Sequence, residues 1–160
     1  MTILRNTDQV VEELLPEGLQ PAQQTLSREF TFAGESASLA PARDAIMQVV
    51  HEYCADEQQE IDILLAVQEA LANAILHGCQ NDASKTVRCT VEVTPCAIQI
   101  TVQDPGPGFN TGSATESTEN GTNLTEHGRG IFMMRSLMDE VSYRRRGSEV
   151  VMKKLRAAAP

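Results

Sequence analysis

Three polar residues, Glu69, Asn73 and His77, are spaced four apart in one stretch of the chain. In a helix, residues four apart are neighbours, so these side chains would project along one edge. Mg²⁺ prefers oxygen ligands and usually keeps waters and substrate phosphates, so the amide oxygen of Asn73 could be its one protein ligand. Glu69 would then be free for acid or base chemistry. Taken alone, the same spacing also describes a solvated helix face.

A second group, DPGPGF at residues 104–109, directly follows an apolar segment that alternates as a strand does. Gly106 and Gly108 would let a ligand approach the backbone closely, because glycine has no Cβ. The carboxylate of Asp104 can accept a strong hydrogen bond, such as one from the exocyclic amine of adenine. The same residues also describe an ordinary Pro-Gly turn that begins with Asp.

A third group, GRGI at residues 128–131, marks the point where a polar stretch gives way to helical spacing. The free N–H groups and the positive dipole end of a helix that begins here would favour an anion such as a phosphate. A glycine pair before a helix also occurs at simple flexible junctions. The fixed order of the three groups, rather than any one of them, indicates a nucleotide site.

The elements that must position these groups fit one domain over residues 27–157, with residues 1–26 as an N-terminal extension. Residues 110–127 are too polar to pack and are expected to form a lid over the ligand. Helices that cover one face of a mostly antiparallel sheet make a two-layer α/β sandwich. The spacing predicts strands over 28–32, 87–93, 97–102, 141–143 and 149–155, and helices over 38–54, over 56–78 and from 131.

The second predicted helix carries Glu69, and its ends are marked in the sequence. Asp56 can cap its first turn, with Gln59 three residues on as in a capping box, and Gly78 ends it. The polar residues of the first group fall outside the stripe that is expected to face the core. The members of that stripe follow the i, i+3, i+4 rhythm: Ile61, Leu64, Leu65, Gln68, Ala72, Ile75 and Leu76.

Composition excludes several classes of function. The net charge of −9 argues against a direct nucleic-acid partner, because phosphate binding draws on clustered Lys and Arg. The four cysteines lack C-x-x-C spacing, which indicates reduced thiols rather than a metal site. No segment resembles a signal peptide, and none is expected to approach a membrane span. The sequence therefore predicts a cytoplasmic protein without a membrane partner.

The three groups together carry a family resemblance. E-x-x-x-N-x-x-x-H, then D-x-G-x-G-F, then G-x-G-I-x-x-M resemble the N, G1 and G2 boxes of GHKL ATPases, the family of gyrase, Hsp90, MutL and histidine kinases. Within it, residues 67–78, 130–141 and 147–154 look like the RsbW-type anti-sigma-factor serine/threonine kinases. The resemblance covers about residues 28–155, and it implies the Bergerat fold, ATP and Mg²⁺.

The resemblance also implies roles for individual residues. Glu69 would be the polarising base, Asn73 the Mg²⁺ ligand and Asp104 the adenine ligand, and Ser148 stands near adenine where the family often has Thr. The implied nucleotide-binding set is Asn73, His77, Asp104, Gly106, Gly108, Gly128, Gly130, Ile131 and Ser148. The activity would be phosphorylation of a Ser or Thr in an anti-sigma-factor antagonist, with a sigma factor as a further partner and a homodimer as the family habit.

One departure concerns the lid, where some relatives place an Arg two residues before the first G2 glycine and this chain has Glu126. Arg129 could supply the missing cation near the transferring phosphoryl group. Two alternatives therefore stay open. In the first, the chain is a nucleotide-dependent binding module with little turnover. In the second, it is a histidine-kinase fragment, for which His51-Glu52 resembles a phosphoacceptor pair but also suits the end of the first helix.

Overall fold

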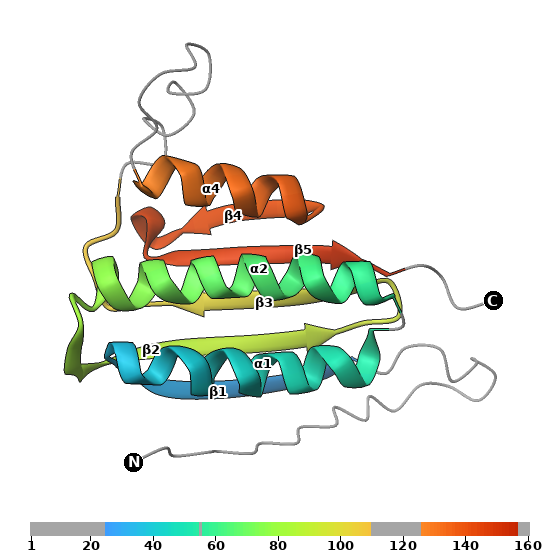
Figure 1. The fold of residues 1–160 in the computed structure, drawn as a ribbon, viewed down its shortest axis with the longest axis horizontal. Coiled ribbons are helices and arrows are strands. Elements are labelled where there is room, and N and C mark those ends of the chain that lie inside the picture. Colours follow the sequence, from blue (N-terminus) through green and yellow to red (C-terminus); the bar gives the residue numbers. More distant parts are fainter. Residues whose placement is uncertain (1–24, 55, 110–125, 157–160) are drawn as a thin grey trace, which may run out of the picture.

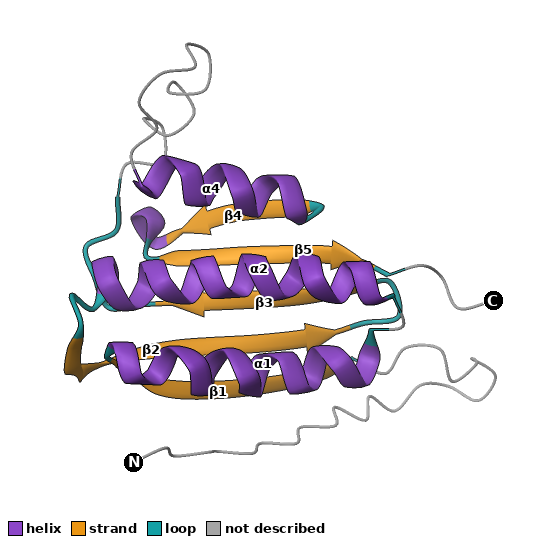
Figure 2. Ribbon diagram, in the orientation of Figure 1, coloured by secondary structure: helices purple, strands orange, loops and turns teal. Residues whose placement is uncertain are grey.

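The computed structural model describes residues 25–54, 56–109 and 126–156. A five-stranded antiparallel sheet has the order β1-β2-β3-β5-β4, and α1, α2 and α4 lie together on one face of it (Figures 1 and 2). The predicted two-layer α/β sandwich is therefore confirmed. The elements are β1 (Leu26–Gly34), α1 (Leu39–Tyr53), α2 (Glu57–Asn73), β2 (Asp82–Val93), β3 (Ala97–Gln103), α4 (Glu126–Leu137), β4 (Glu140–Arg144) and β5 (Glu149–Leu155).

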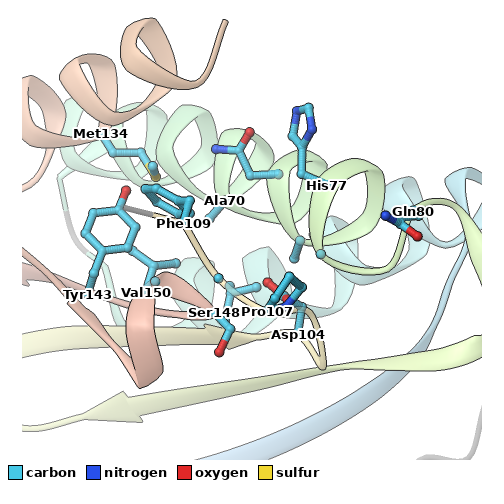
Figure 3. A pocket seen from close by; sticks show the side chains of 16 residues that line it. Ala70, His77, Gln80, Asp104, Pro107, Phe109, Met134, Tyr143, Ser148 and Val150 are labelled. Atoms are coloured by element: carbon cyan, nitrogen blue, oxygen red, sulfur yellow. The ribbon is translucent and has the colours of Figure 1, made fainter. Parts of the chain in front are cut away.

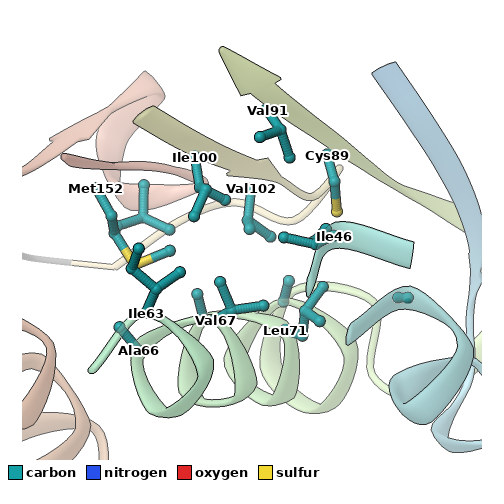
Figure 4. Packing of buried hydrophobic residues seen from close by; sticks show 14 of the residues in the cluster. Ile46, Ile63, Ala66, Val67, Leu71, Cys89, Val91, Ile100, Val102 and Met152 are labelled. Atoms are coloured by element: carbon teal, nitrogen blue, oxygen red, sulfur yellow. The ribbon is translucent and has the colours of Figure 1, made fainter. Parts of the chain in front are cut away.

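The core lies between the helices and the sheet, and the alternation of the strands explains it. Because successive strand residues point to opposite faces, every second residue is buried from Val87 onward in β2 and from Ile98 onward in β3. Side chains of α2, with Ile46 of α1, meet Ile100, Val102 and Met152 from the central strands (Figure 4).

The buried face of α2 and of the turn after it is not the predicted stripe, although Ile75 of that stripe is buried as predicted. Ile61, Leu65 and Leu76 of the expected stripe are 43%, 42% and 51% exposed, and Gln68 is exposed as well. The face that packs on the sheet has the same rhythm but smaller side chains: Ile63, Ala66, Val67, Ala70, Leu71, Ala74 and Ile75. Helix α2 crosses the middle of the sheet (Figure 1). The alanines on its buried face let the helix pack close to the strands.

The N-terminus of α2 is capped as predicted, with one difference. The Asp56 carboxylate accepts hydrogen bonds from the backbone N–H groups of Gln58 at 2.8 Å and Gln59 at 3.3 Å. The side chain of Gln59 does not complete a capping box, because it donates to the carbonyl of Leu155 instead, at 3.1 Å. The side chain of Gln59 therefore links the start of α2 to the end of β5.

The helical stretch Glu57–Gly78, which is α2 with the turn that follows it, is 22 residues long and apolar enough to cross a membrane by length and composition. The expectation that no segment approaches a membrane span was therefore wrong on this measure. The core helix of a soluble protein passes the same test. This stretch buries its inward face on the sheet.

A shielded ion pair joins α2 to β5 and to the end of α4. Lys154 of β5 donates to the carboxylate of Asp62 at 3.0 Å and to the carbonyl of Leu137 at 2.6 Å. The two charged side chains are only 13% and 19% exposed, so water screens them little. Burial acts to raise the pKa of Asp62, but hydrogen bonds from Lys154 and Gln58 and the Lys154 charge outweigh it and lower that pKa.

Replacing Asp62 with Asn should lower the free energy of unfolding by about 1–2 kcal/mol at neutral pH, because Lys154 loses its charged acceptor. A lowered folded-state pKa stabilises the fold above the unfolded-state pKa, and this contribution disappears as the pH falls through the folded-state pKa. The difference from wild type in urea unfolding should therefore shrink in acid. Glu140→Gln, at the more exposed Lys153–Glu140 pair, is the control and should change little. A constant difference at every pH would contradict the role of Asp62.

Candidate functional site

A pocket opens where the end of α2, the turn after β3, the start of β5, and α4 come together (Figure 3). Five of the residues predicted to bind a nucleotide line this pocket: Asn73, His77, Asp104, Gly108 and Ser148. They come from positions 73 to 148 in the chain, so the fold brings together residues that are far apart in the sequence. The pocket is also the place where the apolar interior reaches the surface beside polar side chains, as in most small-molecule sites.

The carboxylate of Asp104 is held tightly at the base of the pocket. One of its oxygens accepts a hydrogen bond from the N–H of Gly106 at 2.7 Å. The backbone N–H of Asp104 donates to the carbonyl of Ser148 at 2.9 Å. A Cβ on Gly78 would collide with this carboxylate, and one on Gly106 would come within 2.7 Å of it. Both glycines are therefore needed for space, and they fix the side chain toward the pocket.

Burial raises the pKa of Asp104, and the N–H of Gly106 opposes that effect only in part. A carboxylate desolvated in this way gains from any hydrogen-bond donor that a ligand brings. Beside it, the hydroxyl of the buried Ser148 donates to the carbonyl of Arg145 at 2.9 Å, which leaves the oxygen as an acceptor. The pair can receive two donors from one ligand.

The turn after Asp104 is joined to the hairpin between β4 and β5. Gly108 has a φ of 77°, which favours glycine, and the N–H of Phe109 donates to the carbonyl of Arg146 at 2.9 Å. Gly147, with a φ of 94°, would bring a Cβ within about 3 Å of Phe109. The second group and the hairpin between β4 and β5 therefore form one wall of the pocket.

The polar side of the pocket comes from the end of α2. After Asn73 the helix widens into a π-helical turn, Ala74–Gly78, in which the N–H of Cys79 bonds to the carbonyl of Ala74 at 2.8 Å. Such single turns are often found at functional sites. The turn brings Asn73 and His77 to the pocket and presses Gly78 against the carboxylate of Asp104.

Glu69 lies one turn before Asn73, between α2 and α4, and does not line the pocket itself. Its carboxylate contacts Gly130, where a Cβ would overlap it. A glycine at position 130 therefore allows α4 to pass close to a carboxylate that stays half-buried. The structure places this acid at the edge of the pocket, next to the first turns of α4.

The third group is not the junction that the sequence predicted. Helix α4 begins at Glu126, so Gly128 and Gly130 lie inside it rather than before it. Gly128 and Ile131 are buried, whereas Arg129 is exposed, and none of these residues lines the pocket. Residues 110–125 of the predicted lid lie outside the described residues.

Several pocket residues were missed by the sequence analysis, and they are mostly apolar. The signals for Phe109 and Met134 were present in DPGPGF and in G-x-G-I-x-x-M, and the others gave none. Phe109 packs edge-on against Tyr143, with 5.3 Å between ring centroids and 75° between ring planes. The remaining missed positions that matter here are Ala70, Val102, Met134, Tyr143 and Val150.

His51, considered as a phosphoacceptor, lies in the last turn of α1. Its Nδ1 is 3.0 Å from a carboxylate oxygen of Glu60, and its side chain is 78% exposed. It does not line the pocket.

The residues present fit a nucleotide with a divalent cation. Asp104 and Ser148 can read a base, and Asn73 offers an amide oxygen to an oxygen-preferring ion. At Gly106 and Gly108 the space of the missing Cβ is taken by Asp104 and by the carbonyl of Arg146, so these glycines make room for the protein's own atoms. Within the described ranges, no group of three or more His, Cys, Asp or Glu side chains could hold a metal by itself. A cation here would therefore depend on Asn73 together with the ligand's phosphates.

Comparisons with known proteins identify the family of this chain. The family model of the histidine kinase-like ATPase domain matches residues 32–154. The chain is 31% identical over 128 residues to the anti-sigma F factor of Clostridium perfringens, which covers 77% of this chain and 91% of that protein. It is 31% identical over 131 residues to the anti-sigma F factor of Geobacillus thermodenitrificans, covering 79% and 88%.

A solved structure resembles the fold. The crystal structure of the RsbU and RsbW domains of Rv1364c from Mycobacterium tuberculosis matches with a TM-score of 0.56 and 16% identity. The match covers 83% of this chain and 33% of that one, so the present chain spans one third of that longer protein.

Proposed function

The chain belongs to the histidine kinase-like ATPase domain family, and on that premise we propose that it is an ATP-dependent serine/threonine kinase of a partner-switching module. Membership implies ATP binding; the phosphoryl transfer is our proposal. The observation that carries it is the meeting of Asp104, Asn73 and Glu69 around one pocket and its edge. In this proposal Asp104 recognises the base, Asn73 binds the ion and Glu69 removes the proton.

In the proposed reaction, the hydroxyl oxygen of a partner Ser or Thr attacks the γ-phosphorus of ATP. The bond from that phosphorus to the β–γ bridging oxygen breaks, ADP leaves, and the hydroxyl proton passes to the Glu69 carboxylate. Mg²⁺, when bound, would offset the negative charge of the phosphates. Asn73 is one helical turn from Glu69, so it would hold that ion on the same edge of the helix as the proposed base.

The proposed partners follow from the names of the relatives. Because these are called anti-sigma F factors, we propose that this protein also binds a sigma factor and phosphorylates an antagonist that competes for it. A homodimer in the cytosol, without membrane or direct nucleic-acid contact, is part of the same proposal. Its basis is the family resemblance and the net charge of −9.

A second function, a nucleotide-dependent binding module with little turnover, is favoured by one observation. Among the described residues that line the pocket there is no Lys or Arg, and Arg129 is exposed on α4. Phosphoryl transfer gains from a cation near the transferring group. In this version ATP would hold the partner-binding surface in shape without being consumed.

Calorimetric titration with ADP, ATP and GTP, with and without Mg²⁺, tests the nucleotide site. ADP and ATP should bind at least about tenfold more tightly than GTP, because guanine presents a carbonyl oxygen to the Asp104 carboxylate where adenine presents an amine. Mg²⁺ should strengthen ATP binding. Equal binding of ATP and GTP, or none, would contradict the proposed site.

Labelled ATP and a candidate antagonist then separate the two functions. A kinase should move the γ-phosphoryl group to Ser or Thr of the antagonist. A binding module should bind the antagonist or sigma factor only when ATP is present and leave both unlabelled.

A further inference from the structure

The hydroxyl of a tyrosine that lines the pocket, Tyr143, has no role in the proposed phosphoryl transfer. Tyr143 lies on β4, and its side chain reaches toward Met134 of α4 and Phe109 (Figure 3). Its hydroxyl oxygen is buried and has no hydrogen-bond partner in the part of the chain that the structure describes. Tyr143 nevertheless lines the same pocket as Asp104 and Asn73.

A buried hydroxyl without a partner destabilises the fold, because it has given up its hydrogen bonds to water. Such groups are rare in native proteins, and each calls for an unseen partner. A phenylalanine at this position would keep the edge-on contact with Phe109 and avoid the cost. The hydroxyl at position 143 is therefore best explained by something that enters the pocket.

The state of the phenol suits it to donate a hydrogen bond. Burial raises the pKa of Tyr143 to about 12, the charge of Arg135 lowers it, and that of Glu69 raises it. The O–H proton therefore stays in place at neutral pH.

The sheet order places Tyr143 away from the proposed base-reading group. β3, which leads to Asp104, and β4, which carries Tyr143, are separated by β5. Neighbouring strands are about 4.8 Å apart, so the two strands approach the pocket from positions about 10 Å apart. A nucleotide held by its base amine at Asp104 would reach Tyr143 with another part of the molecule.

We propose that the Tyr143 hydroxyl donates a hydrogen bond to the bound nucleotide, at a polar atom away from the base amine that Asp104 reads. This inference rests on the proposed nucleotide site. It adds a ligand-binding residue that the three sequence groups do not contain. It also explains why a polar atom is retained in an otherwise apolar part of the pocket.

Tyr143→Phe tests the proposal, with ADP binding measured by calorimetry and stability measured by urea unfolding without nucleotide. The variant should bind ADP about five- to thirtyfold more weakly, the loss expected for one hydrogen bond. Its stability without nucleotide should be unchanged or higher, because an unpartnered hydroxyl has been removed. Tyr53→Phe, at the other tyrosine of the chain, is the matched control and should leave ADP affinity unchanged.

Two results would overturn the inference. The first is equal ADP affinity in Tyr143→Phe and wild type while Asp104→Asn still loses affinity, which would leave the nucleotide site intact. The second is lower stability of nucleotide-free Tyr143→Phe with no selective loss of ADP binding, which would give the hydroxyl a structural role. If the wild type binds no nucleotide at all, the proposed function fails and this inference fails with it.

Discussion

Glu69→Gln should slow phosphoryl transfer to the partner by about 10²- to 10⁴-fold, the usual contribution of a general base, while ATP binding changes little. Glutamine has nearly the same shape, so it keeps the close contact with Gly130 between α2 and α4. It cannot accept the proton of the attacking hydroxyl. The measurement is the single-turnover rate with labelled ATP, compared with ATP affinity by calorimetry.

Glu60→Gln is the control for this experiment. Glu60 lies on the same helix and contacts His51 rather than the pocket, so its replacement should leave the transfer rate unchanged. Full transfer by Glu69→Gln would remove the acid from the mechanism. An equal loss of ATP binding and of rate would instead make Glu69 part of the binding site.

Asp104→Asn should weaken ADP binding by about 10- to 150-fold, which corresponds to about 1.5–3 kcal/mol for a hydrogen bond to a charged group. Asparagine can still accept the hydrogen bond from the N–H of Gly106. It presents its own N–H to the base amine, so the loss is specific to the ligand. Calorimetry at neutral pH measures it, with Asp82→Asn on the exposed start of β2 as the control.

The same carboxylate should make nucleotide binding depend on pH. Because burial raises the pKa of Asp104, the group takes up a proton at a higher pH than an ordinary aspartate. Wild-type ADP affinity should therefore fall as the pH drops through this raised pKa, and that fall should be absent in Asp104→Asn. Parallel pH profiles for the two proteins would show that another group controls binding.

The same pKa shift predicts the effect of Asp104→Asn on the fold itself. A raised pKa means that the folded state disfavours the ionised form, so the carboxylate costs stability at neutral pH. Urea unfolding of Asp104→Asn without nucleotide should therefore show no loss of stability. A large loss would mean that the substitution disturbs the turn, and the binding result could not be assigned to the ligand.

The order of elements could be predicted from the sequence because each strand alternates and each helix has a periodic apolar face. Strands β3 and β5 match the predicted ranges to within one residue. Strand β2 begins at Asp82, five residues earlier than predicted, because Asp82 and Thr86 also pair with β1, across a shift in register that the alternation of side chains does not reveal.

The buried side of α2 could not be chosen from spacing alone. Two faces have the same rhythm, and the face with larger side chains, such as Ile61 and Leu65, is the exposed one. Which face turns inward depends on how closely the helix approaches the sheet, and that is a tertiary property. Alanines at positions 66, 70 and 74 are the signal that was overlooked.

The candidate site divides in the same way. Residues within the motifs, such as Asn73 and Asp104, were predicted because local spacing carries their chemistry. Tyr143 was missed because it reaches the pocket only through the order of the strands. Arg129 lies in a predicted group, yet it is exposed because it falls on the outward face of its helix.

The π-helical turn Ala74–Gly78 has a consequence for how the gene for this protein can vary. A turn of this kind equals an α-helix with one inserted residue. Losing one residue would remove the wide turn that the N–H of Cys79 closes onto the carbonyl of Ala74, and with it the backbone path that carries Gly78. Gly78 would then leave the side of Asp104. Substitutions at the exposed Leu76 can be tolerated here, whereas insertions and deletions cannot. Among functional descendants this segment should therefore differ in residue type but keep its length.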